Sequence, residues 1–188
     1  MISATDLRKG SKFMYRNEPY IVLDYQHSKQ ARGRALVQVK VKNMITGSIV
    51  TDTLRSDEKF QIPDLQHRPM QYLYAEDGMY NFLDQDNYDQ VVLSEDQIED
   101  VKPYLKEQAI YDMLYFSEQP IAINPPLFME LEVTNTPPGV KGDTAQGGGN
   151  KPATLETGLV LQVPLFVDIG DILKIDTRDA KYIERVKK

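Results

Sequence analysis

The sequence contains no cysteine and only two histidines among its 188 residues. The lack of cysteine excludes a disulfide scaffold, a thiol nucleophile and every zinc site with cysteine ligands. His27 and His67 stand 40 positions apart. They therefore lack the close spacing of a histidine metal centre, and we expect them on the surface or in a hairpin. We expect neither a metal nor another cofactor.

Long apolar runs are also missing. No stretch approaches the roughly 18 consecutive apolar residues of a membrane-spanning helix. Residues 1–13 lack the apolar segment of a secretion signal. Apolar residues still make up 41% of the chain, enough to bury a core. We therefore expect a folded, monomeric protein located in the cytoplasm.

Charge is distributed unevenly along the chain. The net charge is −6 overall, but it is +5 for residues 1–63, −10 for 64–127 and −1 for 128–188. Such asymmetry favours a first part that binds a polyanion and a middle part that a polyanion would repel. Proline-bearing connectors at 61–64 and 124–126 fall at the same boundaries. We therefore expect three domains with these limits.

Short strands and turns fill most of the chain, without the alternation of strands and helices that marks parallel sheets. The cleanest alternation covers 37–41, where three valines face one way and Gln38, Lys40 and Lys42 face the other. Three units of about 60 residues fit small barrels of about five strands each. The pattern predicts an all-β protein of three barrels in a row, the last two of the OB type.

One helix is predicted in the middle part. Ser94 and Gln97 have the spacing of a capping box, and apolar residues continue at helical spacing to Leu105. Pro103 limits how far the helix extends. In an OB-type barrel, such a helix would plug one end.

No catalytic constellation is present. The sequence lacks GxSxG, a Walker A loop and a strand-to-helix GxGxxG. Acidic pairs such as Asp84 with Asp86 and Glu95 with Asp96 lie among turn residues and are typical of a solvated face. A hydrolase that used them would need a base and a nucleophile that the sequence does not offer. We expect a protein that is not an enzyme.

A basic segment, Ser-Lys-Gln-Ala-Arg-Gly-Arg-Ala at 28–35, joins two alternating strands and is expected to form a hairpin tip. Lys29, Arg32 and Arg34 would project three cations from it. Cations at a tip suit phosphate binding, and arginine adds stacking and forked hydrogen bonds. A solvated basic loop without a partner remains the alternative reading of these residues.

A second candidate is Gly142, Asp143 and Thr144, within a long turn-rich stretch expected from Thr136 to Pro152. Glycine allows a close backbone approach, aspartate accepts hydrogen bonds from base amino groups, and threonine donates or accepts. A turn that satisfies only its own backbone is the alternative.

The third part carries the most specific pattern. It reads Lys-Pro-Ala-Thr-Leu at 151–155, Gly158, Val-Pro-Leu-Phe-Val at 163–167, Gly-Asp at 170–171 and Ile-Asp-Thr-Arg at 175–178. With these residues the chain resembles the bacterial elongation factor P family over its whole length. The hairpin corresponds to the family's modified loop, whose lysine version reads Lys-Pro-Gly-Lys-Gly-x-Ala. Arg32 aligns with the modified residue.

The resemblance implies an N-terminal KOW or SH3-like barrel, two OB-fold barrels and a tRNA-like overall shape. It implies a factor that binds both ribosomal subunits between the P and E sites. There it would position peptidyl-tRNA and relieve stalling at consecutive prolines. Residues 142–144 would approach the E-site codon of the mRNA. Candidates for contacts with tRNA or ribosomal RNA are Lys29, Arg34, Lys40, Lys42, Tyr182 and Arg185.

Two features depart from the pattern. Arginine replaces lysine at Arg32, so a β-lysine modification is not expected, whereas family members with an arginine tip are rhamnosylated. The triplet Ala31-Arg32-Gly33 is similar to the loop of a paralogue, the elongation factor P-like protein, but residues 142–144 match the main family.

The sequence leaves open whether Arg32 is modified at all, and which enzyme would modify it. The paralogue and a non-catalytic ribosome- or RNA-binding module remain alternatives; a small ribosomal protein would usually be strongly basic.

Overall fold

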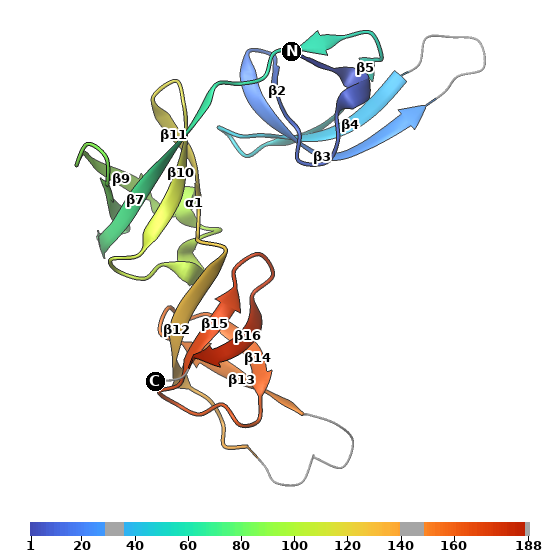
Figure 1. Ribbon diagram of the computed structural model, residues 1–188. Helices are drawn as coiled ribbons and strands as arrows, with labels where there is room; N and C mark the ends of the chain where they lie inside the picture. Colours follow the sequence, from blue (N-terminus) through green and yellow to red (C-terminus); the bar gives the residue numbers. More distant parts are fainter. Residues whose placement is uncertain (29–35, 140–148, 187–188) are drawn as a thin grey trace. The chain divides into compact units, whose positions relative to one another are not determined.

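The computed structural model describes residues 1–28, 36–139 and 149–186. These residues form two compact units, Met1–His67 with Leu114–Ala122 and Arg68–Met113 with Ile123–Lys188. Nearly all regular structure is β-strand, as expected, and Figure 1 shows the strands in chain order. The three-domain limits at 63 and 127 stay a prediction. No helix within the described residues is long and apolar enough to cross a membrane.

The N-terminal strands form two small sheets. A four-stranded antiparallel sheet has the order β2 (Lys12–Tyr15), β3 (Glu18–Ser28), β4 (Leu36–Asn43) and β5 (Ile49–Arg55). Strands β1 (Ile2–Ser3) and β6 (Lys59–Phe60) pair beside it, and a short 3-10 helix, η1 (Ala4–Asp6), follows β1.

The alternation predicted for 37–41 is confirmed in β4. Val37, Val39 and Val41 are each at most 1% exposed and belong to the core, whereas Lys40 on the opposite face is exposed. Because β4 pairs with both β3 and β5, its register is fixed from two sides. The side chains of β4 that face away from the core are therefore held in fixed positions.

The first of two five-stranded sheets has the order β11-β10-β7-β8-β9. Its strands are β7 (Leu65–Glu76), β8 (Met79–Asp84), β9 (Gln90–Ser94), β10 (Ile110–Phe116) and β11 (Gln119–Asn124). The C-terminal sheet has the order β14-β13-β12-β15-β16. Its strands are β12 (Phe128–Asn135), β13 (Asn150–Leu155), β14 (Val160–Pro164), β15 (Ile172–Asp176) and β16 (Lys181–Val186). Counted along the chain, both sheets run 5-4-1-2-3, which agrees with two OB-type barrels.

The predicted helix is short. Helix α1 covers only Glu95–Ile98, and a 3-10 helix, η2 (Lys102–Tyr104), follows it. The capping contact forms, because the Gln97 side chain accepts the Ser94 backbone N–H at 3.0 Å. Pro103 has no N–H, and its ring would clash with a helical carbonyl four residues earlier. The helix ends before it, as predicted, although apolar residues at helical spacing continue to Leu105. Ile98 is nevertheless fully buried.

The turn-rich stretch was expected to reach Pro152, but β13 already begins at Asn150. Proline is tolerated at 152 because pairing between β13 and β12 goes no further than Thr154 with Asn135, so no neighbouring strand needs its missing N–H on that side. The Pro152 carbonyl instead accepts the Thr136 hydroxyl at 2.9 Å. The described part of this stretch is therefore tied to the C-terminal sheet.

Candidate functional site

Strands β3 and β4 carry the basic hairpin. Their last described pair joins Ser28 to Leu36, so residues 29–35 connect two neighbouring antiparallel strands. Arg32 is the middle residue of that connection. Lys29, Arg32 and Arg34 themselves lie outside the described residues, and their roles stay predictions. What the structure establishes is the paired base from which the connection starts.

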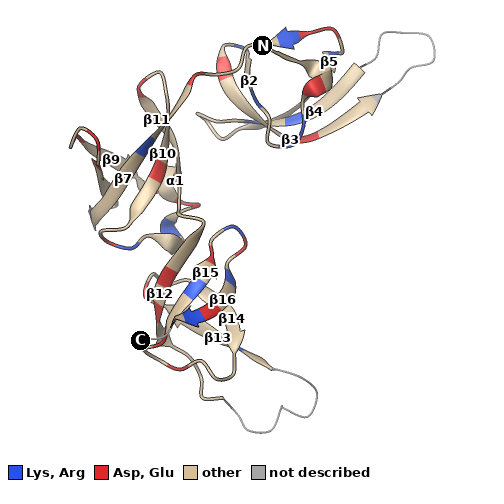
Figure 2. Cartoon of the chain, in the orientation of Figure 1, with Lys and Arg blue, Asp and Glu red and all other residues tan. Residues whose placement is uncertain are grey.

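Two lysines of β4 form a basic stripe. Lys40 is exposed and Lys42 is half-buried, with Cα partners Asp24 and Ile21 on β3. Within the described part of the chain, neither ammonium group has a recorded ion pair or hydrogen bond. Both charges are therefore free to bind an external anion. Figure 2 shows the basic and acidic segments along the chain.

A stacked row on the same sheet was not found from the sequence. The Arg8 guanidinium lies 5.2 Å from the centre of the Tyr25 ring, and Tyr25 meets His27 edge to face at 5.5 Å. Arg8 is fixed because it donates to the carbonyls of Thr5 at 2.8 Å and Leu7 at 2.7 Å. The two-residue spacing of Tyr25 and His27 could have revealed their pairing. No local signal links Arg8 to them.

The His27 end of this row lies next to the end of β3, where residues 29–35 begin. His27 is exposed on β3, as expected for a surface histidine, and precedes the last described residue of that strand, Ser28. Guanidinium, phenol and imidazole groups stack well on nucleic-acid bases and sugars. Tyr25 and His27 pair with Val39 and Val37 and therefore lie on the core side of the sheet, whereas Lys40 lies on the outer face. The row and the lysine stripe thus occupy opposite faces of the strands that lead into residues 29–35.

Residues 142–144 also lie outside the described residues, but the structure describes the segments that lead into and out of this region. Lys151 on β13 is only 4% exposed, and its ammonium donates to the Pro137 carbonyl at 2.8 Å. Gly139 packs so closely that an added Cβ would lie 2.6 Å from the Leu165 carbonyl oxygen. Residues 136–139 are therefore held against the C-terminal barrel by the Lys151 hydrogen bond and by the packing of Gly139 on Leu165. Sequence reasoning quoted Lys151 only as part of a family pattern and missed this contact.

The Asp-Thr-Arg triplet of that pattern forms a structural link. The Asp176 carboxylate is 7% exposed and accepts Arg178 Nε at 3.0 Å and Arg178 Nη2 at 2.5 Å. The Arg178 side chain and backbone hydrogen bonds lower the pKa of Asp176 to about 2. The Thr177 hydroxyl donates to the Pro126 carbonyl at 2.7 Å. These residues tie the end of β15 to the segment before β12.

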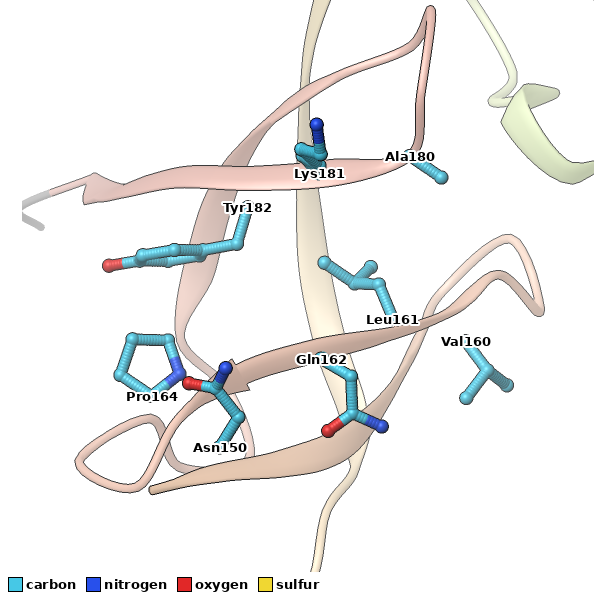
Figure 3. A pocket seen from close by; sticks show the side chains of 8 residues that line it. All are labelled: Asn150, Val160, Leu161, Gln162, Pro164, Ala180, Lys181 and Tyr182. Atoms are coloured by element: carbon cyan, nitrogen blue, oxygen red, sulfur yellow. The ribbon is translucent and has the colours of Figure 1, made fainter. Parts of the chain in front are cut away.

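Tyr182 and Arg185 have separate surroundings on β16. Arg185 donates to Asp171 at 3.2 Å, and its guanidinium lies 5.2 Å from the centre of the exposed Phe166 ring. Tyr182 is half-buried and lines a pocket between β14 and β16 (Figure 3). The structure thus brings the two candidates onto one strand but not into one cluster.

Metal ligands do not gather in the described ranges: no group of three or more histidine, aspartate or glutamate side chains there could hold a metal ion. The acidic pairs of the middle part serve local structure. Asp84, which is buried, accepts the backbone N–H of Asp86 at 2.8 Å, and Glu95 pairs with Lys102. The predicted solvated face is therefore wrong for Asp84, which is buried, and confirmed for Asp86, Glu95 and Asp96, which are exposed.

Comparison with known proteins places all three parts of the chain in one family. Residues 3–60 match the Elongation factor P (EF-P) KOW-like domain, residues 65–123 its OB domain and residues 129–185 the Elongation factor P, C-terminal model. The solved structure of eukaryotic translation initiation factor 5A from Methanococcus jannaschii is similar in fold, with a TM-score of 0.55 and 18% identity. That likeness covers 66% of this chain and 93% of that one.

Curated relatives agree over the full length. The chain is 43% identical over 187 residues to elongation factor P of Thermodesulfovibrio yellowstonii, covering 100% of each chain. It is 46% identical over 187 residues to elongation factor P of Desulfotalea psychrophila, again covering 100% of each. The sequence resemblance is therefore confirmed, and so is the assignment to translation. The chain belongs to the elongation factor P family of translation elongation factors.

Proposed function

We propose that this protein binds the ribosome between the P and E sites and positions peptidyl-tRNA for peptide-bond formation. It acts as a non-catalytic, monomeric factor in the cytoplasm, with P-site tRNA, ribosomal RNA and E-site mRNA as partners. One observation carries the proposal. The β3–β4 ladder carries two unpaired lysines on its outer face and Tyr25 and His27 on the other face, and it leads directly into the segment that holds Arg32.

The N-terminal sheet supplies the tRNA-facing surface in this proposal. Lys40 and Lys42, on the outer face, neutralise backbone phosphates. The row of Arg8, Tyr25 and His27, on the other face, contacts sugars or unpaired bases near the end of β3. Lys29 and Arg34 add phosphate contacts beside Arg32. The acidic charge of residues 64–127 repels RNA elsewhere and so favours one orientation of the factor.

Positioning accounts for the gain in rate without acid–base chemistry by the protein. Proline has a fixed φ, so consecutive prolines restrict the nascent chain and hinder its approach to the reactive geometry. A rigid hairpin base that holds the tRNA 3′ end removes part of that conformational search. Well-oriented reactants avoid much of the entropic barrier of a bimolecular step. Arg32 makes the contact, with or without a modification added by a dedicated enzyme.

The C-terminal barrel supplies the second point of contact. Asp143 and Thr144 bind the E-site codon, and Gly142 allows the backbone to approach it closely. The Lys151–Pro137 hydrogen bond and the packing of Gly139 on Leu165 support this role, because both restrict the chain that enters the segment. Tyr182 and Arg185 contact RNA of the small subunit.

The deciding experiment is peptide synthesis on Pro-Pro-Pro templates in a purified translation system, with and without this protein. Faster synthesis on the proline template, with no change on a proline-free template, supports the proposal. Ribosome binding without any gain in rate would instead support a non-catalytic ribosome- or RNA-binding module. A gain limited to a different set of stalling sequences would support the function of the paralogue.

A further inference from the structure

A pocket of about 400 Å³ opens between β14 and β16, the two edge strands of the C-terminal sheet. In Figure 3, Tyr182 extends from β16 toward β14, with Pro164 and Asn150 facing it across the gap. Leu161 extends from β14 toward β16 in the same view. The pocket therefore has an aromatic wall and an apolar floor.

Polar groups at this pocket lack partners. Within the described residues, no hydrogen bond is recorded for the side chains of Asn150 or Tyr182. The Asn150 amide offers both a donor and an acceptor, and the phenol offers one more hydroxyl. Gln162 extends away from Tyr182 in Figure 3. Lys181 stands at the rim with its ammonium 2.6 Å from Asp179, and 72% of its side chain is exposed. A planar ligand with polar edges and a neighbouring anion would match this set.

The position in the fold supports the same ligand class. OB barrels bind oligonucleotides on the face of their second and third strands, between the loop joining strands one and two and the loop joining strands four and five. Here the second and third strands are β13 and β14. Asn150 opens β13 directly after the first of these loops, and Lys181 opens β16 directly after the second. The pocket lies where an OB barrel receives single-stranded nucleic acid.

We propose that this pocket binds one unpaired base of single-stranded RNA. The base stacks on the Tyr182 ring, the amide of Asn150 binds its polar edge, and Lys181 binds an adjacent phosphate. Because an amide can donate or accept, the pocket takes bases of more than one kind. The proposal rests on the proposed function in taking RNA as the partner, and it adds a defined binding site with two residues not otherwise assigned, Asn150 and Lys181.

The test is an NMR titration of the isotope-labelled full-length protein with a hexauridine RNA. We expect chemical-shift changes at the side-chain amide of Asn150 and at the backbone of Tyr182. Tyr182→Ala should weaken binding about 5- to 150-fold, the range expected for loss of one stacked base. Tyr182→Phe keeps the ring and should bind within about 3-fold of wild type. Tyr74→Ala, which removes an exposed tyrosine from β7, is the matched control and should change nothing.

Equal affinity of Tyr182→Ala and wild type would overturn the proposal, as would shifts confined to residues outside the pocket. An extended hexapeptide is the second probe, because edge strands also accept peptides. Shifts along β14 and β16 with the peptide but not with the RNA would likewise overturn it. The translation test is independent of this one. A wild-type protein that fails to stimulate Pro-Pro-Pro synthesis contradicts the proposed function but leaves the RNA titration unchanged.

Discussion

The buried ammonium of Lys151 donates to the carbonyl oxygen of Pro137 at 2.8 Å, which joins β13 to the chain that follows β12. No other hydrogen bond of this ammonium is recorded within the described residues. A buried cation bound to one carbonyl carries a desolvation cost, so it is a weak source of stability. Its clearest effect is geometric, because it fixes the direction in which residues 138 and beyond leave the barrel.

Lys151→Met should therefore separate positioning from stability. The variant keeps most of the side-chain volume and loses one hydrogen bond but also a buried charge, so the free energy of unfolding should change by no more than about 1 kcal/mol. Rescue on Pro-Pro-Pro templates should fall several-fold while ribosome binding stays close to wild type. Lys59→Met, at an exposed position on β6, is the control. If Lys151→Met rescues synthesis as fast as the wild type, the Lys151–Pro137 hydrogen bond has no positioning role.

Ribosome binding should depend on the basic stripe of β4. Reversing Lys40 and Lys42 together to glutamate should weaken binding at least about 10-fold, because two phosphate contacts become repulsive. The slope of log K against log salt should fall by about 1 for each lysine lost. The fold should persist, since Val37, Val39 and Val41 on the other face are untouched. Filter binding at several salt concentrations measures both quantities.

The control is the double variant Lys9→Glu with Lys59→Glu, which changes the net charge by the same amount at positions outside β4. If both double variants lose affinity equally, net charge rather than the stripe determines binding. If binding of the wild-type protein does not depend on salt, phosphate contacts do not contribute to it.

Acid stability should depend on Asp176. Its pKa is about 2 in the folded protein, where Arg178 binds the carboxylate, against about 3.9 in an unfolded chain. A lowered pKa stabilises the folded state fully above pH of about 4, and this contribution is lost as pH falls toward 2. Asp176→Asn should therefore unfold at a lower temperature at pH 7, and its stability should depend less on pH between about 4 and 2.

Thermal unfolding followed by circular dichroism across this pH range provides the measurement. Asp89→Asn, which removes one carboxylate that has no recorded ion pair within the described residues, should give a curve parallel to that of the wild type. An Asp176→Asn curve parallel to the wild type would mean that the Arg178 contact does not link folding to proton binding.

Asp143→Ala tests the codon contact assigned to residues 142–144. Rescue should decrease, while the free energy of unfolding should change by less than about 0.5 kcal/mol, as is usual for loop substitutions. Single-turnover peptide synthesis and thermal melts report the two effects separately. Asp89→Ala serves as the control. If Asp143→Ala rescues synthesis as fast as the wild type, Asp143 does not contact the codon, and its side chain serves only the local turn.

Period-two alternation was enough to predict β4, because one strand there separates a valine face from a lysine face. It fails for Tyr72 and Tyr74, which share a spacing of two, since Tyr72 is buried and Tyr74 is 44% exposed. A register shift between them turns the strand over, and such bulges depend on the partner strand rather than on local sequence.

Long-range contacts explain what the sequence did not reveal about the site. Arg8 meets Tyr25 only after η1 and β3 pack together, and Lys151 meets Pro137 only when β13 folds back along β12. Lysine is normally expected on the surface, so nothing local indicated that Lys151 is buried. The sequence pattern did place the basic segment between two strands, because β3 and β4 lie on either side of it and pair with each other.

The most direct test of the account is the rate of Pro-Pro-Pro synthesis with Arg32→Ala in a purified translation system. We predict that most of the rescue is lost while ribosome binding falls only modestly, because the contacts of Lys40 and Lys42 remain. Arg34→Ala should be milder. Arg32→Lys should keep part of the activity if charge alone suffices, and lose it if a guanidinium-specific modification is required. The intact mass of protein from its native host would reveal an added deoxyhexose. Rescue by Arg32→Ala as fast as by the wild type would contradict both the role of this residue and the positioning mechanism.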